Sequence, residues 1–236
     1  AGEVGPTAEF PQGIDLPWII ATAPRRAGGF WLLCETDRIF SFAEGRAEPW
    51  AGNAWLAREQ VQITAMVEAE DGTLVVGTER HGASFFRAGA VEPFRVLDKE
   101  LGPGAIGIQA LLTDASGGIW IATTRGLVRC DRQLDHILFD ERHGITGRVE
   151  AVALHRGLLH VGTSRGLFAA NPHASTLEEA FAALDVSESV QDMVVAGDEL
   201  LVGGTAFRVV DAAGGLTTID APAAFSSLIP PVGIRD

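Results

Sequence analysis

The sequence predicts an all-β protein, a β-propeller of about five four-stranded blades. Two observations predict it. A segment centred on one apolar or aromatic anchor position recurs along the chain at intervals of 44, 45, 40 and 41 residues. Within each recurrence, runs of β-favouring residues alternate with turns rich in Gly or Asp, which is typical of antiparallel strands. The anchor positions of the five units are Trp31, Val75, Trp120, His160 and Leu201.

The strands of a unit follow one another in a fixed order. An apolar or alternating run, such as those that begin at Ile108 and Val149, is expected to be the first strand. The second strand carries the anchor, and the third begins at a Gly-Leu pair or its equivalent. Fourth strands are expected in "AVEPFRVL" and "LDHILFD". In "STLEEAFAAL", residues 175–184, apolar positions repeat at helical spacing behind a Ser-x-x-Glu capping pattern. A short helix is therefore expected to replace or precede the outer strand of that blade.

The repeats divide the chain into blades, which cannot bury both faces alone and must stack on one another, with the anchor aromatics between them. Five blades are visible, and three arrangements stay open: a five-bladed propeller, a six-bladed one with a blade split between the termini, or part of a larger propeller. A partial propeller would expose apolar blade faces and associate, for example as a homodimer. The expected blades are 17–58, 59–104, 105–146, 147–187 and 188–220, with an N-terminal extension or closing segment at 1–16 and a C-terminal linker or closing segment at 221–236.

One segment matches a catalytic pattern. Gly162-Thr163-Ser164-Arg165-Gly166 reads G-x-S-x-G, the pattern of the nucleophile elbow in serine hydrolases. A nucleophile elbow needs a strand, a sharp turn and then a helix. The preceding unit has Thr124 where this one has Ser164, and a strand is expected after both. We therefore interpret Ser164 as a residue of a repeated turn, and no catalytic residue is assigned.

The third and fourth units carry a family resemblance. Trp120-Ile121-Ala122-Thr123 is followed two residues later by Gly126-Leu127, and Val161-Gly162-Thr163 is followed in the same way by Gly166-Leu167. These segments resemble two-component regulator propeller repeats, whose blades read Trp-Ile-Gly-Thr, two variable residues and then Gly-Leu. The first and fifth units depart from this pattern. The resemblance implies a non-enzymatic, ligand-binding sensor domain of a bacterial signalling receptor, periplasmic or extracytoplasmic, with its output signalling domain outside this sequence.

The candidate ligand surface consists of cations in turns. In a propeller, the turns between second and third strands share one face with the connections between blades. Against a formal net charge of −13, cations in these places suggest a surface for an anionic or carbohydrate small molecule, because Arg suits carboxylates and phosphates. The alternative is that these arginines are solvated or pair with neighbouring acids. The candidates are Arg38, Arg80, His81, Arg125 and Arg165 in turns, and Arg142 and His143 in a connection.

Composition narrows the function classes. Strong acidity disfavours nucleic-acid binding, and no run of 18 apolar residues occurs. Cys34 and Cys130 are expected to be free thiols, and His155 and His160 lack a third ligand at metal-binding spacing, so no metal or cofactor is predicted. The sequence has no initiator Met, and we expect a processed chain or an excised domain. The alternatives to a sensor are a propeller enzyme, a lyase or glycoside hydrolase, and a protein-docking scaffold.

Overall fold

The computed structural model describes residues 16–101, 107–211 and 214–219. Most of the proposed terminal segments 1–16 and 221–236 therefore lie outside the described residues. The chain divides into two compact units, one ending at Thr113 and the other beginning at Asp114. Among the described residues, no helix is long and apolar enough to cross a bilayer.

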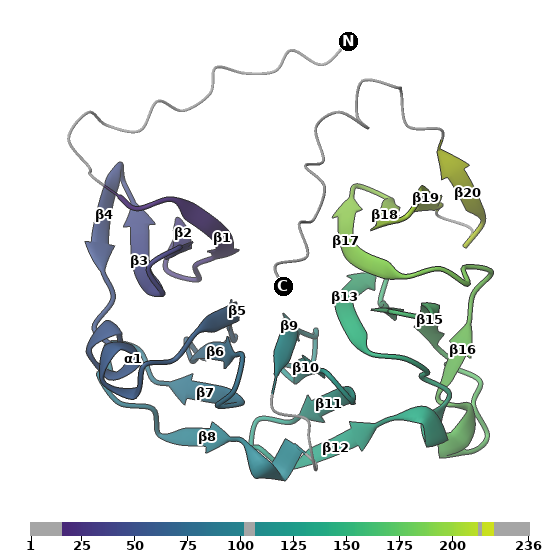
Figure 1. The fold of residues 1–236 in the computed structure, drawn as a ribbon, viewed down its shortest axis with the longest axis horizontal. Helices are drawn as coiled ribbons and strands as arrows, with labels where there is room; N and C mark the ends of the chain where they lie inside the picture. The colour runs from purple at the N-terminus through teal and green to yellow at the C-terminus, as the bar shows by residue number, and fades with distance from the viewer. Residues whose placement is uncertain (1–15, 102–106, 212–213, 220–236) are drawn as a thin grey trace, which may run out of the picture. The chain divides into compact units, whose positions relative to one another are not determined.

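The described residues form five four-stranded sheets, each with its strands side by side in chain order. Figure 1 shows the strands of each blade as neighbouring arrows. This confirms the predicted fold class. The strands are, in blade one, β1 Ile19–Pro24, β2 Phe30–Cys34, β3 Arg38–Ala43 and β4 Arg46–Pro49; in blade two, β5 Ile63–Glu68, β6 Leu74–Thr78, β7 Ala83–Phe86 and β8 Arg95–Leu97; in blade three, β9 Ile108–Thr113, β10 Ile119–Thr123, β11 Gly126–Cys130 and β12 His136–Phe139; in blade four, β13 Val149–His155, β14 Leu158–Thr163, β15 Gly166–Ala170 and β16 Phe181–Ala183; and in blade five, β17 Val190–Ala196, β18 Glu199–Gly204, β19 Phe207–Val210 and β20 Leu216–Ile219.

In the described part of the chain, one short α-helix and three 3₁₀ turns join or interrupt the strands. The helix α1, Asn53–Glu59, connects blades one and two, and the 3₁₀ turn η1, Lys99–Leu101, follows β8. A second 3₁₀ turn, η2 at Glu141–His143, lies between blades three and four. The third, η3 at Leu177–Glu179, stands directly before β16, which confirms the expectation of a short helix before that outer strand.

The core of the first unit is rich in tryptophan. Trp50 follows β4 and Trp55 lies in α1, and both are buried against Phe86, with ring centroids 4.7 and 5.5 Å from it. Trp31, the anchor of blade one, packs edge-on against Trp50 at 6.5 Å. These tryptophans are thus core residues, and neither Trp50 nor Trp55 is available to stack on a ligand.

In both units, neighbouring blades pack through a glycine of the second strand. A Cβ on Gly77 would lie 2.5 Å from the Ile108 side chain of the next blade, and a Cβ on Gly162 would lie 2.6 Å from Val190. The Gly of the repeated Gly-Thr pair is therefore needed so that the first strand of the following blade can approach. Blade three carries the next smallest residue, Ala122, which is fully buried.

The cysteines and histidines singled out in the sequence are buried. Neither Cys34 nor Cys130 forms a disulfide, as predicted, and burial raises the pKa of Cys34, with the nearby Glu35 carboxylate adding to the shift. His155 donates to the Asp198 carbonyl through Nε2 (2.8 Å), and His160 contacts the Leu158 carbonyl through Nδ1 (3.1 Å). The anchor histidine is therefore a packed, hydrogen-bonded core residue.

Candidate functional site

In three blades a buried threonine hydroxyl closes the turn between the second and third strands, and the turn of blade two is one residue longer than the other two. In blade four, the fully buried Thr163 hydroxyl donates to the Gly166 carbonyl at 3.2 Å and accepts the Arg165 backbone N–H at 3.0 Å. Thr78 and Thr123 make the corresponding pairs of hydrogen bonds in blades two and three. The repeated threonine thus ties down the turn backbone, and the following side chain projects from a fixed position.

Ser164 has a structural role in this turn. Its backbone N–H donates to the Arg148 carbonyl at 2.9 Å, and its hydroxyl accepts the Arg148 backbone N–H at 3.0 Å. The strand β15 follows at Gly166, where a nucleophile elbow would require a helix. The two hydrogen bonds attach the incoming connection to the turn, which confirms that Ser164 belongs to a repeated turn.

In the second unit, the turns of blades three and four lie at the two ends of one connection. Phe139, at the end of β12, pairs with Leu127 beside the β10–β11 turn. Val149, at the start of β13, pairs with Thr163 beside the β14–β15 turn. Residues 140–148 therefore run from the turn that carries Arg125 to the turn that carries Arg165. We call the surface formed by these two turns and this connection the turn end of the second unit.

Two of the predicted cations on this surface are already engaged. Asp140 accepts the Arg142 side chain at 2.9 Å, and its backbone N–H donates to His143 Nδ1 at 3.1 Å in a capping box around η2. The hydrogen bonds from Arg142 lower the pKa of Asp140 to about 2. Asp140 thus holds both residues, Arg142 through its carboxylate and His143 through its backbone N–H, and both help to shape the connection.

Three other predicted cations project without such a partner. Arg125 and Arg165 occupy the exposed turn positions of blades three and four, and Arg38 opens β3 of blade one, also exposed. Among the described residues, none of these three guanidinium groups pairs with a carboxylate. We call Arg38, Arg125 and Arg165 the turn arginines. Since a protein of net charge −13 has many carboxylates to offer, their unpaired state leaves them able to bind an anion from solution.

The β6–β7 turn of blade two differs from those of blades three and four because a small hollow lies beside it. A small hollow of about 200 Å³ is lined by Arg80 and His81 together with Glu79 and two glutamines of the preceding connection, Gln60 and Gln62. Arg80 is highly exposed and lies 3.9 Å from Glu79, a weak ion pair. The structure therefore brings Arg80 and His81 together with an acid and two amides.

Sequence reasoning missed one feature of the second unit. A groove of about 420 Å³ lies between the outer parts of blades three and four, with Trp120, Phe139 and Phe181 among its lining residues. The anchor Trp120 was expected to fill the space between blades, but it is only half-buried and faces this groove. The signal that was available is the irregular segment 175–184, which supplies one wall.

No family model matches the chain, and no curated protein matches it. Several solved structures have a similar fold. One is the extracellular domain of BT3049 from B. thetaiotaomicron, assigned to a hybrid two component system, with a TM-score of 0.64 and 17% sequence identity. The match covers 92% of this chain and 30% of the BT3049 chain. Streptogramin B lyase is similar with a TM-score of 0.66 at 12% identity, over 89% and 72% of the two chains. A protein assigned as a gluconolactonase reaches 0.61 at 12% identity, over 86% and 78%.

The chain has the β-propeller fold. At these identities the likeness shows the fold alone, and the similar proteins include both extracellular domains of one- and two-component systems and proteins assigned as enzymes. The chain spans about 30% of the length of the extracellular domains that it matches.

Proposed function

We propose that the chain is a non-enzymatic sensory module that binds an anionic small molecule at the turn ends of its blades, outside the cytoplasm. The observation that carries the proposal is that, in the part of this acidic chain that the structure describes, the turn arginines pair with no carboxylate. The resemblance to two-component regulator propeller repeats and the fold shared with extracellular receptor domains support it. The same proposal includes that the module is the input domain of a bacterial signalling receptor whose output domain lies outside this sequence.

The physical basis of recognition is a fixed cation. Because the Thr123 and Thr163 hydroxyls hold the turn backbones, Arg125 and Arg165 project from set positions at the two ends of one connection. A guanidinium group offers a planar set of N–H donors to a carboxylate or phosphate. Two such groups on one surface suit a ligand with two or more anionic groups.

A thermal-shift experiment tests the proposal. The chain is heated with citrate, inorganic phosphate, nucleotides, and neutral and acidic sugars, and an anionic ligand is expected to raise Tm by mass action. Arg125→Ala and Arg165→Ala should each lose most of that rise. The matched control is Arg156→Ala, because Arg156 lies in the turn at the opposite end of blade four and pairs with Asp198 at 3.1 Å. If the control lost as much of the anion-induced rise in Tm as the two turn variants, the proposal would be contradicted. If no anion raised Tm, a protein-docking scaffold would be favoured.

An enzyme is the second candidate, favoured by the hollow at the β6–β7 turn. That hollow places a carboxylate, Glu79, and an imidazole, His81, in one lining, and such a pair can act in general acid–base catalysis. Streptogramin B lyase and the gluconolactonase show that this fold supports enzymes. Turnover of lactones or cyclic esters that is abolished in both Glu79→Gln and His81→Ala would establish this function; no turnover by the unaltered chain would leave the sensor.

A further inference from the structure

The groove between blades three and four has an aromatic wall that is held rigidly. Trp120 donates its indole N–H to Asp114 Oδ2 at 3.1 Å, and Arg129 binds the same carboxylate while its guanidinium lies 5.7 Å from the indole centroid. Burial alone would raise the pKa of Asp114, but the hydrogen bonds from Ser116, Gly118 and Arg129 outweigh it, so that the pKa lies below its usual value. Because its only donor is used, Trp120 presents just its aromatic surface to the groove.

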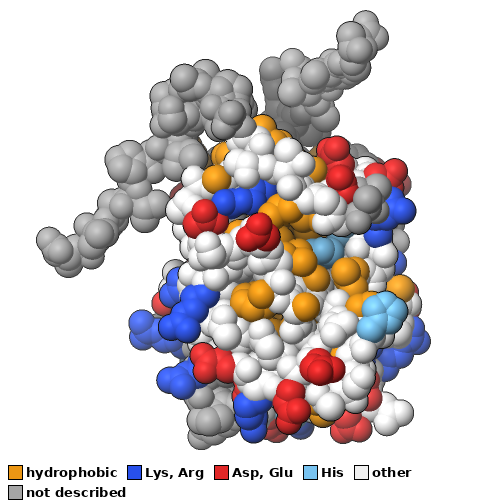
Figure 2. Space-filling view, turned by 90° about the vertical axis from the view of Figure 1, so that its right-hand side faces the viewer, with side chains coloured by type: hydrophobic (Ala, Val, Ile, Leu, Met, Phe, Trp, Pro, Cys, Tyr) orange, Lys and Arg blue, Asp and Glu red, His pale blue; other side chains and the backbone are white. Residues whose placement is uncertain are grey.

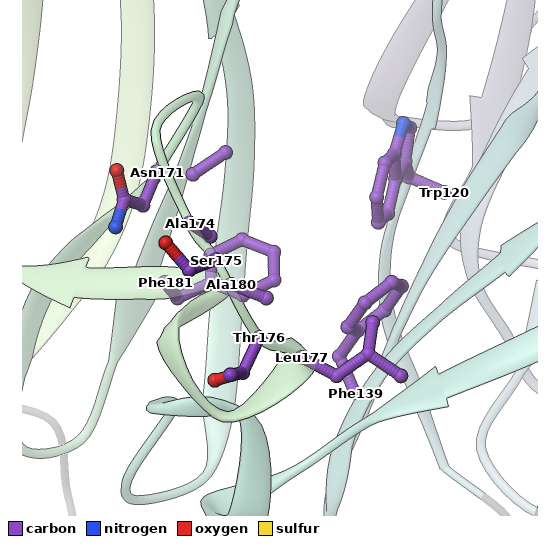
Figure 3. Close-up of a pocket in the computed structure, with 10 residues that line it drawn as sticks. Trp120, Phe139, Asn171, Ala174, Ser175, Thr176, Leu177, Ala180 and Phe181 are labelled. Carbon is purple, nitrogen blue, oxygen red and sulfur yellow. The ribbon is translucent and has the colours of Figure 1, made fainter.

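Phe139 extends this wall, and Phe181 of blade four meets it from the other side. Phe139 lies 5.7 Å from Trp120 with the planes tilted by 35°, and Phe181 meets Phe139 edge-on at 5.5 Å. Phe181 is buried, whereas Trp120 and Phe139 are half-buried because the groove stays open between them and the opposite wall. Figure 3 shows Trp120 and Phe139 on one side of the groove and the residues of blade four facing them.

The opposite wall is the irregular segment of blade four. The connection between β15 and β16 has ten residues, 171–180, where that between β11 and β12 of blade three has five, 131–135. Its backbone is held by the Asn171 N–H bond to the Ala180 carbonyl (2.8 Å) and by the Ser175 N–H bond to Glu179 (3.1 Å). The departure from the repeat thus builds a defined wall.

This wall carries the polar groups of the groove. Asn171 uses its Oδ1 to accept the His173 N–H at 3.0 Å, which leaves its amide N–H groups for other partners. Within the part of the chain that the structure describes, the Ser175 and Thr176 hydroxyls have no hydrogen-bond partner. One edge of a bound molecule would therefore find hydrogen-bonding groups, while the remainder would contact Phe139, Phe181 and alanines.

Among the described residues, no charged side chain lines the groove. Figure 2 looks at the side of β16 and β20 and shows hydrophobic side chains gathered near the middle of that face, with charged ones around them. Leu177 of η3, on the groove's rim, is 65% exposed. An ion would lose hydration here without a counter-charge, so the lining favours an uncharged molecule.

We propose that this groove binds a neutral aromatic ring compound that carries a hydroxyl or carbonyl group on one edge. The volume of about 420 Å³ falls in the range of small-molecule sites, roughly 300–1,000 Å³. A flat ring stacks well on Trp120 and Phe139. A pyranose fits worse, because its hydroxyls surround the ring and those facing Ala170, Ala180 and Phe181 would be left unpaired. The site is separate from the turn arginines.

Saturation-transfer difference NMR tests the proposal, with 4-methoxyphenol as the probe and methyl glucoside and 4-methoxybenzoate as comparison compounds. Saturation transfer to the phenol is expected to exceed that to the sugar and to the anion. Ala174 lies on the blade-four wall, so Ala174→Phe fills the groove from that side and should weaken binding of the phenol at least tenfold. Ala88→Phe is the matched control, because Ala88 is exposed in the β7–β8 turn of blade two and lines no part of the groove. Equal binding in the two variants, preferred binding of the sugar, or no binding would each overturn the proposal.

The polar wall gives a second readout that does not depend on blocking the groove. The double variant Ser175→Ala with Thr176→Val changes two exposed side chains, so folding should be unaffected. It should weaken 4-methoxyphenol about threefold but leave anisole, which lacks the hydroxyl, unchanged. An equal effect on both compounds would contradict the assignment of the polar edge. Arg125→Ala with Arg165→Ala should alter neither, which separates this site from the proposed anion surface.

Discussion

Blades four and five, both in the second unit, show what the repeated residues are for. In blade four, Gly162 is covered by Val190 of the next blade, and Thr163 closes the turn. In blade five, the equivalent positions are Gly203 and Gly204. A Cβ on Gly203 would meet nothing closer than 3.5 Å. The Gly-Thr pair is thus intact in blade four, where Val190 of the next blade packs on its glycine, whereas blade five keeps the glycine but has Gly204 in place of the threonine.

The outer face of blade five is exposed accordingly. Paired positions on adjacent strands, Val194 with Leu201 and Phe207 with Ile219, are between 37 and 54% exposed. The inner face is buried against blade four through Met193, Leu200 and Val202. Since both faces of blade five are apolar but only the inner one is buried, the exposure of the outer face does not follow from its own strand pattern.

The largest effect should come from crowding the glycine that is covered. Gly162→Ala puts a Cβ 2.6 Å from the Val190 side chain and 3.2 Å from its carbonyl, and a β-branched residue cannot turn away easily. We expect a loss of about 2–3 kcal/mol in the free energy of unfolding, measured by urea denaturation. Gly203→Ala in blade five is the matched control and should change stability by less than about 0.5 kcal/mol. Similar losses in both variants would contradict the comparison.

A smaller effect should follow from removing the hydroxyl that closes the turn. Thr163→Val keeps the volume but leaves the Arg165 N–H and the Gly166 carbonyl without their buried partner, at a cost of about 2 kcal/mol. Thr217→Val, on the exposed strand β20 of blade five, should be close to neutral. Thermal unfolding measures both, and a neutral Thr163→Val would show that water replaces the hydroxyl at no cost.

The repeated contacts also explain which parts of the fold could be predicted. Thr163 and Gly166 act within one turn, Gly162 acts against the next blade, and all three recur, so aligning the units with one another is enough to reveal the turn that contains Ser164. The helix α1 gave no such signal. Gly52 at its start makes no side-chain capping bond, and the helix is held by burial of Trp55 and Leu56, which is a tertiary effect.

The site was only partly predictable for a similar reason. The turn positions of Arg125 and Arg165 follow from the repeat, but which arginines pair with an acid depends on local geometry, as Asp140 shows with Arg142. The aromatic groove depends on Trp120 and Phe139 from one blade and Phe181 from the next. No spacing within one repeat indicates that these side chains would leave a space open between them.

The smallest expected effect is a pH dependence of stability, and it arises from the residue at the anchor position of the second strand. Blade four has the buried His160 where blade five has Leu201. Burial lowers the pKa of His160, the Leu158 carbonyl opposes this, and the neighbouring His155 adds to it. The unfolded chain then binds a proton at a higher pH than the folded one does. Stability should therefore fall as the pH drops through the ordinary histidine pKa of about 6.5, and level off below the folded value.

Replacing the histidine by the blade-five residue sharpens this contrast. His160→Leu should flatten the decline of Tm between pH 7 and pH 5, whatever its effect at pH 7, because the proton-binding difference is removed. His173→Leu, at an exposed position of the same blade, should retain the decline. Tm measured at half-unit intervals of pH gives the slope for each variant. An unchanged slope in His160→Leu would mean that the acid sensitivity of blade four arises from another group, and the buried His155 beside it would be the next to replace.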